Sequence, residues 1–382
     1  NTDFIRTTEK RHKDSVQHIW KELEKNGDIY LSKYSGWYSV SDEAFYSNEE
    51  IEEEEGIKIA KVSKSQVEWM DEESFFFKLS KWEKPLLKYY KENPDFIQPE
   101  TRRNEVISFV ENGLKDLSIS RKSFSWGIKV PGNDNHVIYV WLDALTNYIS
   151  ALNYPNINDK LFKNFWPATI HLIGKDILRF HAIYWPAFLL AANVKLPKKV
   201  YGHGWILSGD EKMSKSKGNI LDPIDIIEKY GLDPLRYYLI KEVSFGNDGN
   251  ISQERLEDCI NSDLANNFGN LCQRTLAFAI KNCDQKIPEE INFNVEDKKI
   301  LDEYSLNLEN ITLEIDKQNI NYYIDFIVNS LFSANKYFND QEPWKKKSDQ
   351  VRLNTIVYTT LEIIRKISFL LYPIIPDSSL KA

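Results

Sequence analysis

The feature that most constrains the fold is an alternation of strand-like and helix-like runs in the middle of the chain. "HVIYVWLDAL" (residues 136–145) is rich in β-branched and aromatic residues and leads toward a helix. "ATIHLIGKDILRFHAIYWPAFLLAA" (168–192) reads as a buried strand, a glycine and a helix, and "KKVYGHGWIL" (198–207) as a third strand. Strands that alternate with helices in this way predict an α/β fold with a parallel sheet.

The character of the chain changes at about Leu256. Strand-like runs stop there, glycines become scarce, and helical patterns continue to the last residue. In the first of these helices one apolar stripe carries Ile260, Leu264, Phe268 and Leu271. This region is therefore predicted to be an α-helical bundle.

The first third of the chain mixes both patterns. Residues 9–26 predict an amphipathic helix, and 84–115 predict two helices that the proline-containing segment "NPDFIQPE" interrupts. The acidic run 48–56 is typical of a solvated loop or face, and "GIKIAKV" (56–62) alternates as a strand does.

Composition narrows the class of protein. The 382 residues carry a net charge of −8, so any binding of nucleic acid must use local patches and shape rather than a basic field. The three cysteines, Cys259, Cys272 and Cys283, have no C-x-x-C spacing, which argues against a disulfide framework and a zinc knuckle. The longest apolar stretch, Phe180 to Val194, is too short for a membrane span, so we expect no membrane association.

The strongest chemical signal is the segment Lys212-Met213-Ser214-Lys215-Ser216. Two lysines and two hydroxyl residues lie in one loop, where ammonium groups, hydroxyls and backbone N–H groups can converge on a polyphosphate. Asp222 and Pro223 then predict a capped helix start that anchors one side of the loop. The alternative is a flexible basic loop on the surface.

The segment KMSKS is the second signature of class I aminoacyl-tRNA synthetases, and its surroundings resemble the methionyl-tRNA synthetase family. The resemblance extends over the strand–helix runs quoted above, "YGHGWILSGDEKMSKSKGNILDP", "INSDLANNFGNLCQRT", "DFIRTTEKRH" and "FIQPETRRNEVISFVENGLKDLSISR". It implies four regions: a connective insertion (1–80), the second half of a Rossmann-like catalytic domain (81–200), the KMSKS loop with a stem-contact region (201–255), and an α-helical anticodon-binding domain (256–382).

The resemblance also implies the reaction. The carboxylate of L-methionine attacks the α-phosphate of ATP, which yields methionyl-adenylate and pyrophosphate, and methionine then passes to tRNA(Met). Mg²⁺ accompanies the phosphates, and catalysis rests on positioning and charge stabilisation. Two lysines, Lys212 and Lys215, would be the catalytic residues.

For ATP, the resemblance implies Gly174, Asp176, His203, Gly204, Lys212, Ser214 and Lys215. Asp176 would accept hydrogen bonds from the ribose hydroxyls, and Gly204 would let adenine approach the backbone closely. The alternatives are that Asp176 only caps a helix starting at Ile177, and that His203 and Gly204 form a strand bulge.

For methionine, the resemblance implies an apolar pocket with one polar group, made by Trp141, Ala144, Leu145, Tyr148, Ile177 and His181. The family often has proline where this chain has Leu145. Core packing is the alternative for Trp141 and Tyr148, and His181 alone would usually be a satisfied core histidine.

For tRNA, the resemblance implies that Asn270, Arg274 and Trp344 read the anticodon. Hydrogen bonds to splayed base edges and stacking on an aromatic plane suit single-stranded RNA. Lys345, Lys346 and Lys347 would add a local basic patch for phosphate. Without the family, Asn270 and Arg274 would read equally well as a solvated helix face.

Two departures from the family pattern qualify this reading. The first C-x-x-C of the zinc knuckle found in many members falls on Ser39 and Asp42, so we expect no zinc and an insertion held by aromatic residues, Trp37, Tyr38, Phe45 and Tyr46. This is the zinc-free bacterial or mitochondrial type, which implies a bacterial cytoplasm or, in a eukaryote, the mitochondrial matrix.

The second departure is that nothing matches the HIGH signature of the first catalytic half. We therefore expect the chain to lack that half, and a non-catalytic tRNA-binding fragment stays open as an alternative. A class I ligase for leucine, isoleucine or valine is a third reading, but the chain has no room for the large editing insertion of those enzymes. No appended dimerisation module is visible, so we expect a monomer.

Overall fold

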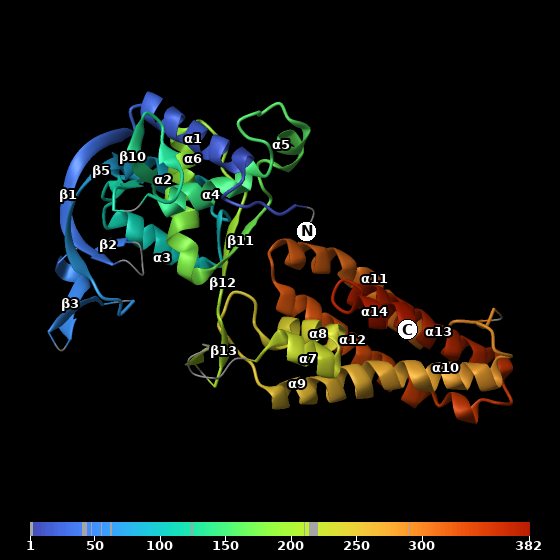
Figure 1. Cartoon of the computed structure of the whole chain (residues 1–382). Coiled ribbons are helices and arrows are strands. Elements are labelled where there is room, and N and C mark those ends of the chain that lie inside the picture. The colour runs from blue at the N-terminus through green and yellow to red at the C-terminus, as the bar shows by residue number, and fades with distance from the viewer. Residues whose placement is uncertain are drawn as a thin grey trace. The chain divides into compact units, whose positions relative to one another are not determined.

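The computed structural model describes residues 3–39, 44–46, 48–54, 56–61, 63–123, 125–209, 211–213, 221–289 and 291–382. Contacts divide the chain into two compact units, Asn1–Gly202 and His203–Ala382 (Figure 1). Within the described ranges, no helix combines the length and the apolar character that a membrane crossing requires.

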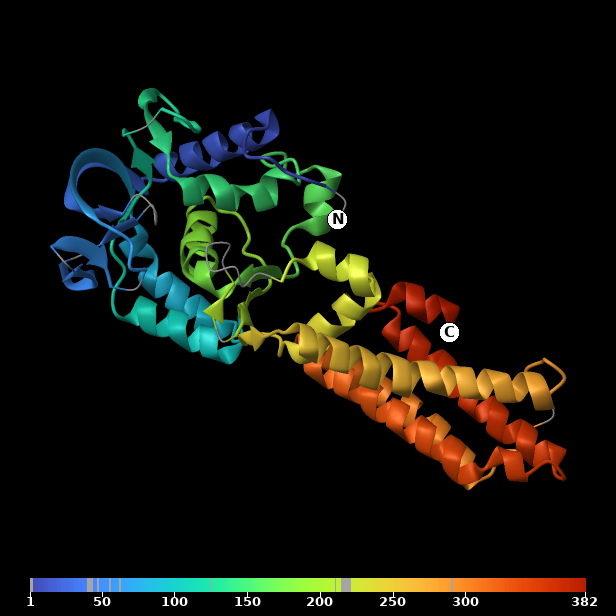
Figure 2. The same cartoon turned by 60° about the horizontal axis from the view of Figure 1, so that its bottom comes forward.

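The first unit begins with helix α1 (Lys10–Lys25), as the pattern over 9–26 predicts. Its apolar stripe is fully buried and consists of Val16, Ile19, Trp20 and Leu23. This stripe joins the main hydrophobic core of the unit. Helix α1 packs along helix α4 (Val140–Ser150), and both views show the two helices side by side (Figures 1 and 2).

Residues 29–77 contain a long antiparallel ribbon of β1 (Ile29–Ser39) and β5 (Glu68–Phe77). Two short strands extend it: β2 (Ala44–Tyr46) pairs with β1, and β7 (Leu117–Ser118) pairs with β5. Of the aromatic residues expected to hold this segment, Tyr38 is buried, and the indole N–H of Trp37 donates to Asn48 Oδ1 at 2.9 Å.

The acidic run is not simply a loop. A 3₁₀ turn (Asn48–Glu50) leads into strand β3 (Ile51–Glu54), which pairs with β4 (Ile57–Ala60), the strand expected from "GIKIAKV". The expected solvation holds for Glu53 and Glu54, which are exposed. Lys64 offsets part of the negative charge through ion pairs with Glu52 and Glu54.

The first unit also contains a three-stranded sheet with the strand order β11-β12-β6. Strand β12 (Val200–His203) is parallel to β6 (Ile97–Gln98). Strand β11 spans His171–Gly174. A 3₁₀ turn (Leu79–Trp82) and helices α2 (Glu83–Glu92) and α3 (Glu100–Glu111) confirm the two helices predicted over 84–115. The break between them contains β6, because the prolines stop the helix and free the backbone to pair with β12.

One expectation about the sheet is wrong. Strand β10 (Asn133–Ile138), from the run "HVIYV", does not join the parallel sheet but forms an antiparallel sheet with β8 (Ser120–Arg121) and β9 (Lys129–Val130). The cause is the tight connection between β9 and β10, where Gly132 adopts a φ of 77°. So short a turn can only join antiparallel neighbours.

The remaining elements of the first unit cover the core. Helix α5 spans Lys160–Phe165, a 3₁₀ turn spans Lys175–Ile177, and a π-helical stretch (Phe180–Tyr184) leads into α6 (Trp185–Ala191). Every residue of α6 except Leu190 is buried. Helix α4 packs on this π-helix and on α6, and its buried residues Leu142, Leu145 and Ile149 belong to the core of the unit.

The second unit begins with a small sheet in which β13 (Ile206–Ser208) pairs antiparallel with β14 (Glu211–Lys212) and parallel with β15 (Gly249–Asn250). Helices α7 (Pro223–Tyr230) and α8 (Leu232–Glu242) follow β14 in the chain. The predicted start of α7 is confirmed, because the Asp222 carboxylate accepts from the N–H of Ile224 at 2.8 Å.

The rest of this unit is helical, as predicted from Leu256 onward, and Figure 2 shows its long helices running alongside one another. The helices are α9 (Gln253–Cys259), a π-helix (Ile260–Gly269), α10 (Asn270–Asn282), α11 (Val295–Asp316), α12 (Ile320–Gln341), a 3₁₀ turn (Pro343–Lys345), α13 (Gln350–Leu371) and α14 (Pro376–Lys381). The predicted stripe is confirmed, since Ile260, Leu264, Phe268 and Leu271 all contact the core of this unit.

Candidate active site and RNA-binding face

The residues expected to bind methionine gather on two neighbouring elements of the first unit. Trp141, Ala144, Leu145 and Tyr148 recur at intervals of three and four residues, so they share one face of α4. Leu145 is almost fully buried, and the other three are half-buried. Ile177 and His181 lie after β11, at the start of the helix that packs against α4.

A hydrogen bond joins the two elements. Tyr148 Oη lies 2.8 Å from His181 Nε2, and His181 Nδ1 lies 2.9 Å from the carbonyl oxygen of Ile177. A carbonyl can only accept, so Nδ1 carries the proton and Nε2 of the neutral ring accepts from the Tyr148 hydroxyl. Tyr148 and His181, both expected at the methionine site, are therefore joined by one hydrogen bond in which Tyr148 donates.

Aromatic rings complete this cluster, and two of them were missed by sequence reasoning. The Trp141 ring stacks on Phe180 with centroids 3.7 Å apart, and the Tyr148 ring lies 4.0 Å from that of His171. His171 is buried at the first position of β11. The signal that could have found it is a histidine at the start of a buried strand, three residues before Gly174.

The cluster is uncharged at neutral pH. Burial, with a smaller contribution from His181, lowers the pKa of His171 to about 3. Burial also lowers the pKa of His181, although its bond to the Ile177 carbonyl opposes the shift, and burial raises the pKa of Tyr148. An aromatic cluster without charge suits contact with an uncharged, apolar side chain and disfavours a charged one.

Gly174 and Asp176 follow this cluster at the end of β11. A Cβ on Gly174 would lie 2.5 Å from Oδ1 of Asp176, so the glycine leaves room for the present position of this carboxylate. The Asp176 side chain is exposed. The alternative reading, an N-cap for a helix starting at Ile177, does not describe the structure, because the 3₁₀ turn already begins at Lys175 and Gly174 is its cap residue.

The other predicted ATP residues belong to the second unit. His203 Nδ1 donates to the carbonyl of Gly204 at 2.8 Å. Packing alone explains why residue 204 is a glycine, because a Cβ there would collide with the backbone of Asn247 and Asp248. The strand bulge considered as an alternative is not needed to explain this glycine.

The signature loop is anchored at both ends. The backbone of Lys212 pairs with Leu207 in the β13–β14 hairpin, and helix α7 begins just beyond the loop at Pro223. Met213 and Leu221 both pack against the core of the second unit. Ser214 and Lys215 lie outside the described residues, as does the side chain of Lys212.

The predicted anticodon residues come together in the helical unit. Arg274 on α10 donates to Asn339 Oδ1 at 2.5 Å, and its guanidinium lies 5.5 Å from the ring of Phe338 on α12. The Phe338 ring lies 6.2 Å from that of Trp344, which is 42% exposed. Asn270 is exposed one turn before Arg274.

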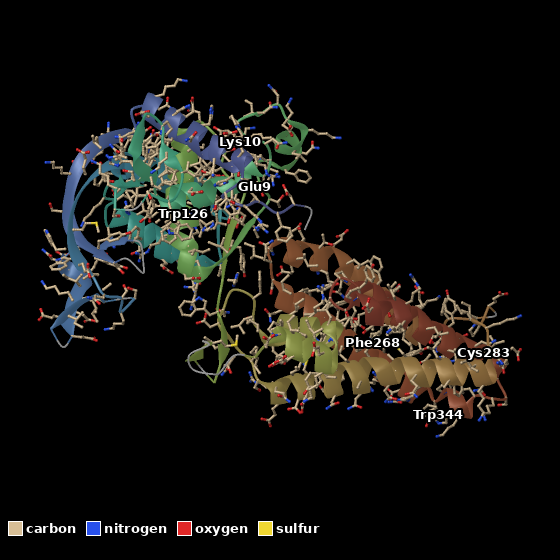
Figure 3. The ribbon with its side chains drawn as sticks, viewed as in Figure 1. Glu9, Lys10, Trp126, Phe268, Cys283 and Trp344 are labelled. Atoms are coloured by element: carbon tan, nitrogen blue, oxygen red, sulfur yellow. The ribbon has the colours of Figure 1, made fainter. Side chains whose placement is uncertain are left out.

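Trp344 lies near the end of the bundle that carries Cys283 (Figure 3). Three exposed lysines, Lys345, Lys346 and Lys347, follow Trp344 directly.

Within the described ranges, no three histidine, cysteine or carboxylate side chains group as metal ligands do. Ser39, at the first position of the expected zinc motif, is buried and donates its hydroxyl to Ser65 Oγ at 3.0 Å. Asp42 lies outside the described residues, so the absence of zinc stays a prediction.

Comparison with known proteins decides the family. The family model described as "tRNA synthetases class I (M)" matches residues 1–57 and 56–276. The chain is 49% identical over 383 residues to a methionine–tRNA ligase of Brucella suis, covering 100% of this chain and 74% of that protein. The chain belongs to the methionyl-tRNA synthetase family.

Other relatives agree with this assignment. A methionine–tRNA ligase of Rickettsia felis is 50% identical over 385 residues, again with 74% of that protein covered. The solved methionyl-tRNA synthetase of Mycobacterium tuberculosis in complex with methionyl-adenylate superposes with a TM-score of 0.96 at 45% identity, over 100% of this chain and 76% of that one. The free-state structure of the same enzyme gives a TM-score of 0.93.

Proposed function

We propose that this protein activates L-methionine with ATP and transfers the methionyl group to tRNA(Met). The observation that carries the proposal is the uncharged aromatic cluster of Tyr148, His181, Trp141 and Phe180 beside the end of β11. Ligands of open α/β sheets bind at the carboxyl ends of strands. The solved relative that superposes on this chain holds methionyl-adenylate, which joins the two halves of this chemistry in one ligand.

In the first step the substrate supplies its own nucleophile. The methionine carboxylate forms a bond to the α-phosphorus of ATP, and the bond from that phosphorus to the bridging oxygen of pyrophosphate breaks. Lys212 and Lys215 would neutralise the charge that develops on the leaving pyrophosphate, while Ser214 and backbone N–H groups orient it. Mg²⁺ would arrive as part of the ATP complex.

The ATP residues divide the remaining work. Asp176 would accept hydrogen bonds from the ribose hydroxyls, and this role is supported by the exposure of its carboxylate next to the end of β11. Gly174 would serve by leaving room for that carboxylate. His203 and Gly204 would face the adenine through the backbone at the end of β12.

The second step also requires recognition of the tRNA. Trp344 would stack on an anticodon base, and Arg274 and Asn270 would donate hydrogen bonds to base edges. The proximity of Arg274, Phe338 and Trp344 supports this assignment. The lysines after Trp344 would contact the phosphate backbone.

The wider organisation follows the family. The four regions 1–80, 81–200, 201–255 and 256–382 would act as connective insertion, catalytic half, signature-loop region and anticodon-binding domain. The bacterial origin of the relatives named above supports a bacterial cytoplasmic enzyme. A monomer is the simplest assembly.

The deciding experiment is amino-acid-dependent exchange of radiolabelled pyrophosphate into ATP, run with the full-length protein. Exchange that depends on methionine supports the proposal. Exchange with leucine, isoleucine or valine instead would identify another class I ligase. No exchange with any amino acid, together with retained binding of tRNA(Met), would identify a non-catalytic tRNA-binding protein.

Lys215→Ala tests the catalytic assignment in the same assay. Because the lysine acts on charge that exists mainly in the transition state, we expect exchange to fall by several orders of magnitude while the dissociation constant of methionine changes little. Lys84→Ala, which removes an exposed lysine of α2, is the matched control. A large loss of methionine affinity with normal turnover would contradict the assigned role.

A further inference from the structure

A buried polar contact outside the predicted site ties the first helix of the chain to the helix that carries the methionine residues. His12 on α1 lies between two side chains of α4: its Nε2 is 2.6 Å from Asp143 Oδ1, and its Nδ1 is 2.8 Å from Ser150 Oγ. His12 and Ser150 are completely buried, and the Asp143 side chain is 18% exposed.

The proton positions follow from the donors and acceptors. A carboxylate only accepts, so Nε2 of His12 must carry a proton and donate to Asp143. The Ser150 hydroxyl can then donate to Nδ1 or to the carbonyl of Asn147, which lies 3.2 Å away. Both ring nitrogens therefore have a partner, and the ring orientation relative to α4 is fixed.

The trio of serine, histidine and aspartate is not a hydrolytic site. A nucleophilic serine must reach substrate, whereas Ser150 is inaccessible and its histidine is fully enclosed. The arrangement is suited to holding two helices in register. Satisfied polar contacts of this kind specify one packing arrangement, because any shift leaves a buried group without a partner.

The two anchor points lie on either side of three of the proposed methionine residues. Asp143 and Ser150 are seven residues apart, two turns of α4, and Ala144, Leu145 and Tyr148 lie between them. On its other side α4 meets the π-helix that carries His181. Rotation of α4 against α1 would therefore move Tyr148 relative to His181 and lengthen their 2.8 Å hydrogen bond.

We propose that His12 is a positioning residue for methionine binding, which acts through Asp143 and Ser150 to set the rotation of α4. The inference rests on the proposed assignment of the methionine site. This positioning role predicts that loss of the His12 contact changes the affinity for methionine selectively. Loss of the contact alters the pocket face of α4 but touches neither the signature loop nor the phosphates.

His12→Gln in the full-length protein tests this. We expect the KM for methionine in pyrophosphate exchange to rise about tenfold, with kcat and the KM for ATP within about twofold, as loss of one buried hydrogen-bonded contact implies. Asp143→Asn keeps the Oδ1 acceptor for Nε2 and should stay near the wild-type KM. Asp143→Leu removes that acceptor and should behave like His12→Gln.

Ser15→Ala is the matched control. Ser15 lies on the same helix and donates to the carbonyl of Tyr154 at 2.5 Å, beyond the end of α4. It should lower the melting temperature as His12→Gln does without changing the KM for methionine. An unchanged KM in His12→Gln, or an equal rise in Ser15→Ala, would overturn the proposal.

Tyr148→Phe separates this proposal from the site assignment beneath it. If Tyr148→Phe also leaves the KM for methionine unchanged, the methionine site is misassigned. If Tyr148→Phe raises the KM and His12→Gln does not, only the positioning role of His12 fails. Should His12→Gln not fold, the comparison of Asp143→Asn with Asp143→Leu carries the test.

Discussion

At the scale of single residues, the proposed methionine site depends on the direction of one hydrogen bond, in which Tyr148 donates to His181. Tyr148 and His181 are 33 residues apart in the chain, and their bond exists only because two helices meet. The neutral state of His181 follows from burial, and its tautomer follows from the carbonyl of Ile177. A residue type alone reveals neither property.

Tyr148→Phe removes the hydroxyl that donates to His181 Nε2 and leaves a buried acceptor without a partner. We expect methionine binding to weaken by about 1–1.5 kcal/mol, roughly five- to tenfold in KM, with the KM for ATP unchanged. Steady-state pyrophosphate exchange measures both constants. Tyr30→Phe, which removes a hydroxyl bonded to Asp116 at the surface of the same unit, should change neither.

Trp344→Ala removes the exposed indole of the proposed anticodon face. Loss of one stacking contact should weaken aminoacylation of tRNA(Met) by about 1–3 kcal/mol in kcat/KM while adenylate formation is unaffected. Phe369→Ala, which removes another exposed aromatic side chain from the helical unit, should leave both steps unchanged. Equal losses in both steps of Trp344→Ala would show a structural role for the tryptophan.

At the scale of elements, turns and close approaches place the site. The short β9–β10 turn removes β10 from the parallel sheet and delivers α4, the next element, against α1 and the π-helix. The β13–β14 hairpin and the Asp222 cap anchor both ends of the signature loop. Each of these turns and caps is local, yet each fixes the position of an element, α4 or the signature loop, to which site residues are assigned.

Gly204 and Gly202 form a matched pair for testing whether a close backbone approach requires glycine. An added Cβ at Gly204 would collide with the backbone of Asn247 and Asp248, beside strand β15, whereas at Gly202 it would meet Leu178 Cδ1 at an ordinary 3.5 Å. Gly204→Ala should lower the free energy of unfolding by about 1–3 kcal/mol, because backbone must shift. Gly202→Ala should lie within about 0.5 kcal/mol of wild type. Thermal and urea unfolding measure the free energies of unfolding of both variants. Equal values for Gly204→Ala and Gly202→Ala would contradict the collision inferred at Gly204.

At the scale of the whole molecule, one buried ion pair bears on stability. Asp297 at the start of α11 is completely buried, accepts two hydrogen bonds from Arg352 on α13 at 2.5 and 3.0 Å, and accepts another from Tyr337 on α12 at 2.5 Å. Three long helices of the second unit therefore share one charge. Burial alone would raise the pKa of Asp297, but these hydrogen bonds outweigh it and lower the pKa below its usual range.

The sign of the pH dependence follows from that lowered pKa. The stabilisation is complete above the pKa of an unfolded aspartate, about 3.9, and is lost as the pH falls through the lower pKa of the folded protein. Asp297→Asn should cost about 3–5 kcal/mol at pH 7, because it leaves Arg352 buried without its counter-charge. The gap in melting temperature between wild type and variant should shrink as the pH falls below about 4. A constant gap down to pH 3 would show that Asp297 does not titrate with folding.

Much of the architecture could be read from short windows of sequence. The helix at 9–26, the two helices over 84–115, the capped start at Asp222 and the helical region after Leu256 are confirmed, since each depends on residues a few positions apart. The family could be recognised for a similar reason, because the signature loop and its flanking strand and helix are continuous in the chain.

Contacts between distant segments had to come from the tertiary structure. His12 meets Asp143 across 131 residues, Gly204 meets Asn247, and β10 leaves the sheet that its composition suggested. Sequence by itself determined which elements form and what chemistry their residues can perform. The packing of those elements decided which residues meet, because burial, donor direction and steric exclusion arise only when segments far apart in the chain come together.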